Sequence, residues 1–152
     1  CRRRGVRFLL NAAPAAPLSE DVLSACDPLV VNESEAQFLL GETAEADPAD
    51  LARRLLDTGP ASVVLTLGSA GALAMTESET ILQPAHRVTA VDTTGAGDAF
   101  VGALATVLAQ GGTLARGLAL GAAVAAHAVQ GVGAQASYPR RADIEKLEGA
   151  RP

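Results

Sequence analysis

One short run of residues combines a flexible backbone with an acidic side chain: Gly95-Ala96-Gly97-Asp98. A helix is predicted from about Ala96 to about Gln110, because apolar residues recur there at helical spacing. Glycines just ahead of a helix let the backbone come close to a ligand. The first turn of a helix also presents unpaired N–H donors and a partial positive charge. The run therefore predicts an anion site that suits a phosphate group.

Asp98, at the end of this run, has two interpretations. In the first, its carboxylate only complements the helix dipole, which contributes about 0.3–1 kcal/mol. In the second, Asp98 is a general base that accepts a proton from an attacking hydroxyl while the N–H groups hold the charge that develops on phosphoryl transfer. The four residues alone favour the first interpretation, so the choice depends on the surrounding sequence.

The elements that must position this run alternate along the chain, which predicts an α/β fold. Strands are expected at 6–10, 29–31 and 62–67, and short strands around 72–75, 81–82 and 87–91 are expected to form a meander at the sheet edge. Helices are expected at 18–25, 34–40, 48–59, 96–110, 114–130 and 142–147. Asp47-Pro48 gives the strongest start signal, with Asp as the N-cap and Pro at the first helical position.

The composition narrows the class of protein. A net charge of −5, with Arg2-Arg3-Arg4 as the only basic cluster in 152 residues, argues against nucleic-acid binding. The apolar stretch 114–132 contains Arg116 and His127, so it is predicted to be a buried helix and not a membrane span. No signal peptide is expected, and Cys1 and Cys26 are expected to be free thiols, which suits a cytoplasmic protein.

Other kinds of site find little support. No His/Cys cluster has the spacing of metal ligands, and neither a P-loop nor a serine nucleophile elbow is present. His86 and His127 receive no functional role, because each is isolated from other residues that could do chemistry.

The longer string at residues 92–103, Asp-Thr-Thr-Gly-Ala-Gly-Asp-Ala-Phe-Val-Gly-Ala, resembles the signature of the ribokinase family of carbohydrate kinases, also called the PfkB family. Four more stretches resemble this family in the same order along the chain: 11–15, 32–35, 66–71 and 133–137. The resemblance covers about residues 6–144. One departure is Ala12, which stands where the family usually has proline.

The resemblance implies a ribokinase-like three-layer α/β/α sandwich. Residues 1–152 would form the C-terminal portion of the large domain, a single partial nucleotide-binding domain without the N-terminal half and its β lid. This chain alone is expected to have negligible kinase activity, because phosphoryl transfer depends on the positioning of both substrates. The full-length protein is expected to be a homodimer.

The resemblance also implies roles for individual residues. Asp98 would be the catalytic base and contact the substrate, and the anion hole would comprise Gly95, Ala96 and Gly97. ATP would contact Asn32, Thr66, Gly68, Gly71 and Gly97. Glu35 would help to place Mg²⁺ through water, and K⁺ would be held by Asp92, Thr94 and Ser137.

Alternatives stay open for several of these residues. Asn32 and Glu35 could be a helix cap and its first-turn carboxylate. Thr66 could be an ordinary strand residue, and Asp92 could simply end a strand.

The implied activity is transfer of the γ-phosphoryl group of ATP to a sugar hydroxyl, with D-ribose O5 as the favoured acceptor and ribose 5-phosphate as the product. ATP and a small sugar would be the partners, with Mg²⁺ and K⁺ as cofactors and no nucleic acid or membrane. A fructokinase or nucleoside kinase of the same family is the alternative enzyme. The non-enzymatic alternative is a truncated protein that binds nucleotide but catalyses no reaction.

Overall fold

The computed structural model describes residues 4–44 and 46–149, and the side chains of these residues up to 145. The chain divides into two compact units. The first comprises Cys1–Gly68 and Ala72–Leu82, and the second comprises Ser69–Gly71 and Gln83–Pro152. Each unit is described by itself below.

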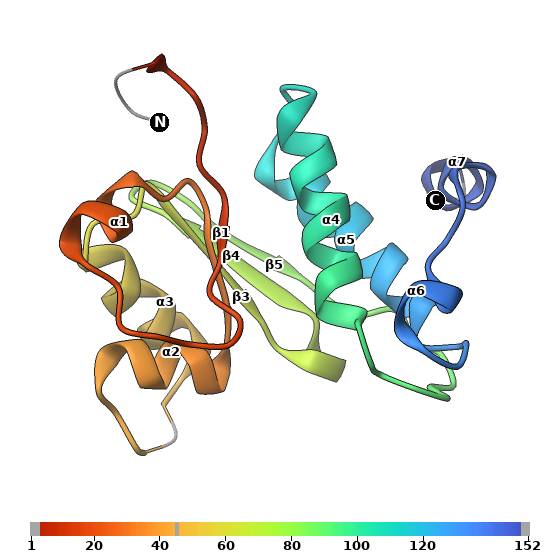
Figure 1. The fold of residues 1–152 in the computed structure, drawn as a ribbon, viewed down its shortest axis with the longest axis horizontal. Helices are drawn as coiled ribbons and strands as arrows, with labels where there is room; N and C mark the ends of the chain where they lie inside the picture. Colours follow the sequence, from red (N-terminus) through yellow and green to blue (C-terminus); the bar gives the residue numbers. More distant parts are fainter. Residues whose placement is uncertain (1–3, 45, 150–152) are drawn as a thin grey trace. The chain divides into compact units, whose positions relative to one another are not determined.

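The first unit is built on a mixed sheet (Figure 1), whose five strands follow one another in the order β1-β2-β3-β4-β5. The strands are β1 (Leu10–Asn11), β2 (Leu29–Asn32), β3 (Ser62–Thr66), β4 (Ala72–Thr76) and β5 (Thr80–Gln83). β1, β2 and β3 are parallel, whereas β4 runs antiparallel to β3. The predicted meander therefore exists at the β3–β5 side of the sheet.

Three helices cover one face of this sheet: α1 (Glu20–Ala25), α2 (Glu33–Leu40) and α3 (Pro48–Asp57). α2 and α3 pack on the central strands through a core that includes Leu29, Leu51, Leu55, Val63 and Leu65. Local signals set the helix ends, since the Asp47 carboxylate accepts a hydrogen bond from Ala49 N–H at 2.8 Å. This core and these caps fix the carboxyl ends of β2 and β3 in place.

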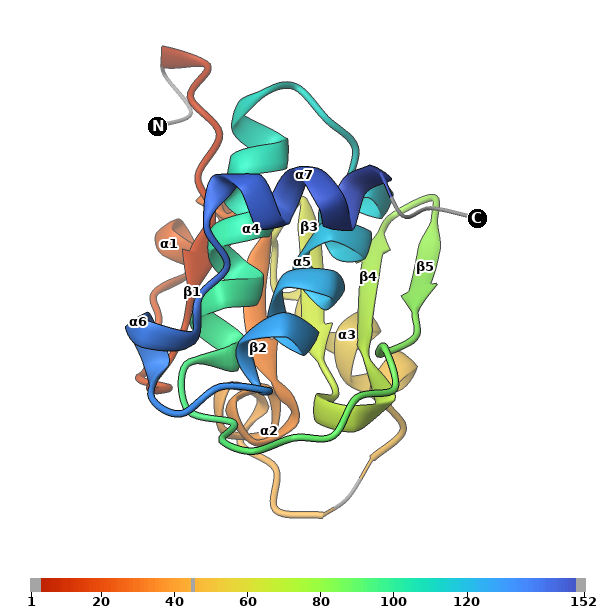
Figure 2. The same ribbon diagram turned by 90° about the vertical axis from the view of Figure 1, so that its right-hand side faces the viewer.

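The second unit is helical and contains α4 (Ala96–Ala109), α5 (Leu114–Ala128), α6 (Ala134–Ser137) and α7 (Arg141–Gly149). α4 and α5 pack closely because two glycines of α5 leave room for α4 side chains. A Cβ on Gly121 would lie 2.7 Å from the Phe100 ring, and one on Gly117 would lie 2.5 Å from Leu104. Figure 2 shows α7 crossing over α5, which it contacts. The α4–α5 pair thus gives the start of α4 a rigid support.

Some predicted elements differ from the structure. The strand expected at 6–10 is reduced to β1, which begins only at Leu10. Asp27 N–H still reaches Phe8 C=O at 2.7 Å. The next residue, Pro28, has no N–H with which to continue a regular ladder. The strand expected around 87–91 is wrong, because that segment is irregular. Val91 N–H there donates to Val129 C=O at the end of α5, at 2.7 Å, and not to a neighbouring strand.

The expected helices agree with the structure to within a few residues at each end, and a short helix, α6, lies where no helix was expected. None of the described helices has the length and the apolar character that a membrane crossing requires.

Candidate functional site

A glycine turn opens α4. Gly95 is the N-cap residue with φ 77° and ψ 2°, and no side chain caps the first turn. The first helical hydrogen bond runs from Ala99 N–H to Gly95 C=O at 2.9 Å, and Ala96 N–H donates to Thr93 C=O at 3.2 Å. Within the described part of the chain, the N–H groups of Gly97 and Asp98 have no partner. Two donors of the first turn are therefore open to an anion, whereas the N–H of Ala96, a predicted member of the anion hole, is already bonded.

Asp98 is exposed in the first turn of α4, whereas the next two residues, Ala99 and Phe100, are buried. The helix thus turns its apolar face into the unit and leaves the carboxylate of Asp98 outside it. A packed Asp98, or a strand at 95–97, would have excluded a base beside a phosphate cradle. Neither is found, so the exposed position of Asp98 agrees with both interpretations, a partner of the helix dipole and a base.

The glycine turn is held by residues that follow α5. The Tyr138 hydroxyl donates to Gly95 C=O at 3.1 Å. A Cβ on Gly95 would lie 2.5 Å from the Tyr138 oxygen and 2.7 Å from Ala134 Cβ. Only glycine fits this position, because the φ is positive and the space is already filled.

Asp92 also connects the glycine turn before α4 to the segment that follows α5. One carboxylate oxygen accepts a hydrogen bond from Thr94 N–H at 2.9 Å, and the other accepts one from Gly133 N–H at 2.9 Å. Hydrogen bonds from the Thr94 hydroxyl, and then from the N–H groups of Thr94 and Gly133, lower the pKa of Asp92 from 3.8 to about 2. The carboxylate is therefore ionised throughout the neutral range.

Acid unfolding is expected to reveal this contribution of Asp92. Its pKa is lowered in the folded state, so the stabilisation is fully present above the ordinary value of 3.8 and is lost as the pH falls from 3.8 towards 2. Urea unfolding of the wild type and Asp92→Asn, in buffer without potassium, measures the effect. The difference between their free energies of unfolding should narrow over this window. A difference that stays constant from neutral pH to about pH 2 would contradict the assignment.

The predicted K⁺ ligands share this region of the second unit. Asp92 and Thr94 lie in the turn, and the Ser137 hydroxyl donates to Ala134 C=O at 2.8 Å, which leaves its oxygen lone pairs open. A set of oxygen atoms that includes one carboxylate held in its ionised form fits a hard cation. Among the described residues, no group of three or more His, Cys, Asp or Glu side chains could hold a metal ion.

The predicted Mg²⁺ residue, Glu35, lies in the first unit and forms a capping box. Asn32 Oδ1 accepts from Glu35 N–H at 2.8 Å, and Glu35 Oε2 accepts from Asn32 N–H at 2.8 Å. The alternative that these residues cap a helix is thus confirmed. It does not exclude the metal role, because Glu35 Oε1 has no partner within the described chain and can accept a hydrogen bond from a metal-bound water.

The other predicted nucleotide residues of the first unit lie where parallel strands end. Asn32 and Thr66 are register partners at the carboxyl ends of β2 and β3. This is the edge of a parallel sheet at which ligands of α/β proteins bind. Thr66 Oγ1 donates to Val31 C=O at 3.4 Å, so the alternative that Thr66 is a strand residue is confirmed.

A tight turn follows β3. Gly68 has φ 54° with no atom within 4 Å of a Cβ position, so its backbone is accessible to a ligand. Gly71 belongs to the second unit, and a Cβ there would overlap the carbonyl oxygen of Gln83. Gly68 therefore suits contact with a ligand, whereas Gly71 is required by the close approach of two backbone segments.

The structure thus gathers Asp92, Thr94, Gly95–Asp98 and Ser137 within the second unit, and Asn32, Glu35, Thr66 and Gly68 within the first. Two contacts with the turn were missed by sequence reasoning, those of Tyr138 and of Gly133 N–H. The chain has one tyrosine, directly after Ser137, and this position was the only signal that could have pointed to Tyr138.

Comparison with known proteins decides the family. A family model described as "pfkB family carbohydrate kinase" matches residues 1–141. The chain belongs to this family. Its resemblance to the PfkB signature is therefore confirmed.

Two relatives of this pfkB-family chain carry the names deoxyribokinase and ribokinase. A deoxyribokinase of Salmonella typhi is 40% identical over 143 residues, which cover 91% of this chain and 46% of the relative. A ribokinase of Mus musculus is 41% identical over 151 residues, which cover 94% of this chain and 46% of the relative. The chain therefore spans about half the length of these curated relatives.

Solved structures show the same relation. Arabidopsis thaliana ribokinase, complexed with ribose and ATP, matches with a TM-score of 0.87 at 31% identity, over 95% of this chain and 48% of that one. A structure from E. coli in complex with ATP and Mg²⁺ matches with a TM-score of 0.74 at 27% identity, over 87% of this chain and 42% of that one. The pfkB-family chain has the α/β ribokinase-like fold, as its sequence predicts.

Proposed function

We propose that this chain supplies the nucleotide-binding half of an ATP-dependent kinase that phosphorylates D-ribose at O5. The observation that carries the proposal is the open first turn of α4, where the free N–H groups of Gly97 and Asp98 adjoin an exposed carboxylate. The similarity to a ribokinase of known structure with ribose and ATP supports the choice of substrates.

In this reaction the Asp98 carboxylate accepts the proton of the sugar hydroxyl, and the sugar oxygen forms a bond to the γ-phosphorus of ATP. The bond from that phosphorus to the β–γ bridging oxygen breaks, and ADP leaves. The free N–H groups of Gly97 and Asp98 stabilise the negative charge on the transferring group, and Gly95 and Ala96 of the proposed anion hole form the turn that presents them. The positive end of the α4 dipole adds to this stabilisation.

The remaining predicted residues would hold ATP and its cations. Asn32, Thr66, Gly68, Gly71 and Gly97 are the proposed ATP contacts. Glu35 would hold Mg²⁺ through water, and Asp92, Thr94 and Ser137 would hold K⁺. Bound Mg²⁺ supplies charge neutralisation of the phosphates. The residues of this chain orient the phosphate chain and hold the glycine turn that receives it.

A second acceptor, 2-deoxy-D-ribose, is favoured by one specific observation. The deoxyribokinase relative is as similar to this chain as the ribokinase relative, at 40% and 41% identity. The two acceptors differ only in one hydroxyl, so a site that hydrogen-bonds that hydroxyl would discriminate strongly between them.

A sugar panel tests the proposal. The full-length protein is assayed for ADP release with ribose, deoxyribose, fructose and adenosine, each with ATP and Mg²⁺. We expect the highest kcat/KM with ribose, and negligible turnover from the 152-residue chain alone. A preference for fructose or adenosine would replace the proposed substrate by that of another family member. ATP binding without any phosphorylation would indicate a non-catalytic nucleotide-binding protein.

A further inference from the structure

Tyr138 makes a contact that the proposed reaction does not yet use. It lies directly after α6, 43 residues from Gly95, and its hydroxyl donates to the Gly95 carbonyl at 3.1 Å in a partly buried setting. A phenol hydroxyl that is removed from water usually finds such a partner. Here the partner is the carbonyl of Gly95, in the turn that opens α4.

The Gly95 carbonyl and the Ala96 N–H belong to one rigid peptide plane, so the direction of one fixes the direction of the other. This carbonyl accepts two hydrogen bonds, from the Tyr138 hydroxyl at 3.1 Å and from Ala99 N–H at 2.9 Å. Glycine adopts more backbone conformations than any other residue, and a glycine turn without further contacts would sample several of them. The Tyr138 hydroxyl therefore adds to the bonds of Ala99 N–H and Ala96 N–H a further restraint on this peptide, which carries the helix into the free N–H groups of Gly97 and Asp98.

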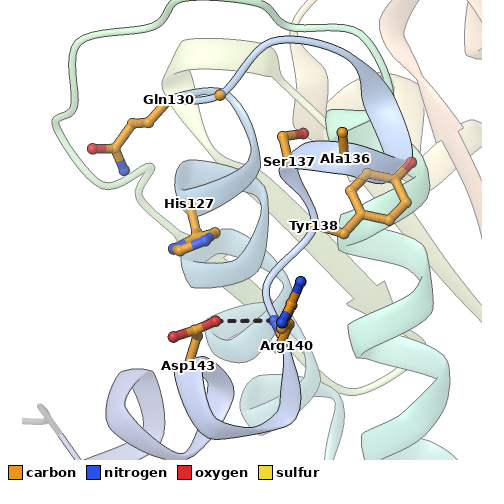
Figure 3. Close-up of a pocket in the computed structure, with 8 residues that line it drawn as sticks. His127, Gln130, Ala136, Ser137, Tyr138, Arg140 and Asp143 are labelled. Carbon is orange, nitrogen blue, oxygen red and sulfur yellow. Dashed lines mark hydrogen bonds between the residues drawn. The ribbon is translucent and has the colours of Figure 1, made fainter.

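The ring of Tyr138 packs against the buried cluster that α4 and α5 form, which includes Ala99 and Ala128. Tyr138 lines a pocket of about 400 Å³ together with residues from the end of α5 and the start of α7, among them His127 and Arg140. Figure 3 shows Tyr138 and His127 on opposite sides of this pocket. Packing on this cluster fixes the ring beside the pocket, and the hydroxyl at its end reaches the glycine turn through the hydrogen bond to Gly95 C=O.

We propose that Tyr138 is a positioning residue for phosphoryl transfer, which orients the Gly95–Ala96 peptide and, through it, the amide donors of the first turn of α4. The inference rests on the proposed kinase function. A positioning role differs from a purely structural role, because it sets the direction of the N–H donors that would stabilise the transferring group.

The test uses Tyr138→Phe, which keeps the ring and removes only the hydroxyl. The matched control is Thr106→Val, which removes a hydroxyl that donates to Gly102 C=O at 2.8 Å, further along α4. In the 152-residue chain, amide NMR is expected to show larger shifts at Gly95, Ala96 and Gly97 for Tyr138→Phe than for the control. In the full-length kinase, kcat is expected to fall about 3- to 10-fold, as for loss of one hydrogen bond. The KM for the sugar should stay within about 2-fold, because the lost interaction acts in the transition state.

Each outcome decides one question. Unchanged amide shifts at 95–97, or shifted amides with an unchanged kcat, would overturn the positioning role. An equal fall in kcat for Thr106→Val would overturn it as well, because the effect would then be general to the unit. A wild-type protein without kinase activity would refute the proposed function, and the amide shifts would still decide whether Tyr138 orients the turn.

Discussion

Asp98→Asn is expected to lower kcat of the full-length kinase by about 10²- to 10⁴-fold, the usual contribution of a general base. The amide has nearly the size of the carboxylate but cannot accept the proton of the sugar hydroxyl. Because Asp98 is exposed, the substitution leaves the packing of α4 intact. Steady-state kinetics and urea unfolding of the same preparation measure both effects.

The control separates catalysis from the helix dipole. Asp50 is also an exposed aspartate in the first turn of a helix, α3, and has no proposed role. Asp50→Asn should change the free energy of unfolding by about as much as Asp98→Asn, within about 1 kcal/mol, and leave kcat unchanged. If Asp98→Asn retained full activity, Asp98 would only complement the dipole and would not be the base.

Gly95→Ala is expected to have the largest effect on stability and to abolish tight nucleotide binding. An L-residue at a φ of 77° costs about 1–2 kcal/mol. The added Cβ must also displace the Tyr138 hydroxyl and Ala134, which lie 2.5 and 2.7 Å away. Overpacking of this kind costs a further ~1–3 kcal/mol. Displacing the turn removes donors to a charged phosphate, so the dissociation constant for ADP should rise about 10-fold or more.

Gly111→Ala is the matched control for the backbone term. Gly111 has a φ of 76°, nearly that of Gly95, but no atom lies within 4 Å of its Cβ position. Gly111→Ala should lower the free energy of unfolding only by the cost of the positive φ, and the variant should bind ADP like the wild type. Thermal unfolding and calorimetric titration compare the two variants. Equal losses in both would show that the contact of Gly95 with Tyr138 and Ala134 does not matter.

Local signals in the sequence predicted local structure well. Asp47-Pro48 predicted the start of α3, and the Asp47 carboxylate does cap it. The spacing of Asn32 and Glu35 predicted a cap, and the structure shows both of its hydrogen bonds. Such features depend on residues only a few positions apart, whose preferences survive in any surroundings.

Features that depend on distant partners were predicted less well. The segment 87–91 has the composition of a strand, but Val91 and Asp92 donate to Val129 at the end of α5, about 40 residues later. The strand expected at 6–10 shrank for a similar reason, since its partner segment contains Pro28. Composition indicates how well a segment suits a sheet, and the neighbouring segment decides whether a ladder forms.

The candidate site shows the same division. The glycine turn and Asp98 could be predicted, because they are contiguous and the start of a helix gives them a clear physical role. The hydrogen bonds that hold the turn could not, because Gly133 and Tyr138 meet it from more than 40 residues away. The sequence therefore predicted which groups would contact a phosphate, and the structure adds what keeps those groups in place.

The capping box of α2 occupies one of the two carboxylate oxygens of Glu35. Glu35 Oε2 is committed to the backbone of Asn32, so only Oε1 remains to meet a cation and its hydration shell. Replacing Asn32 would unravel the end of α2 and at the same time release Glu35 from its fixed orientation. Under the proposed magnesium role of Glu35, selection on the helix terminus and selection on cation affinity would act on the same pair, and neither residue could change independently of the other.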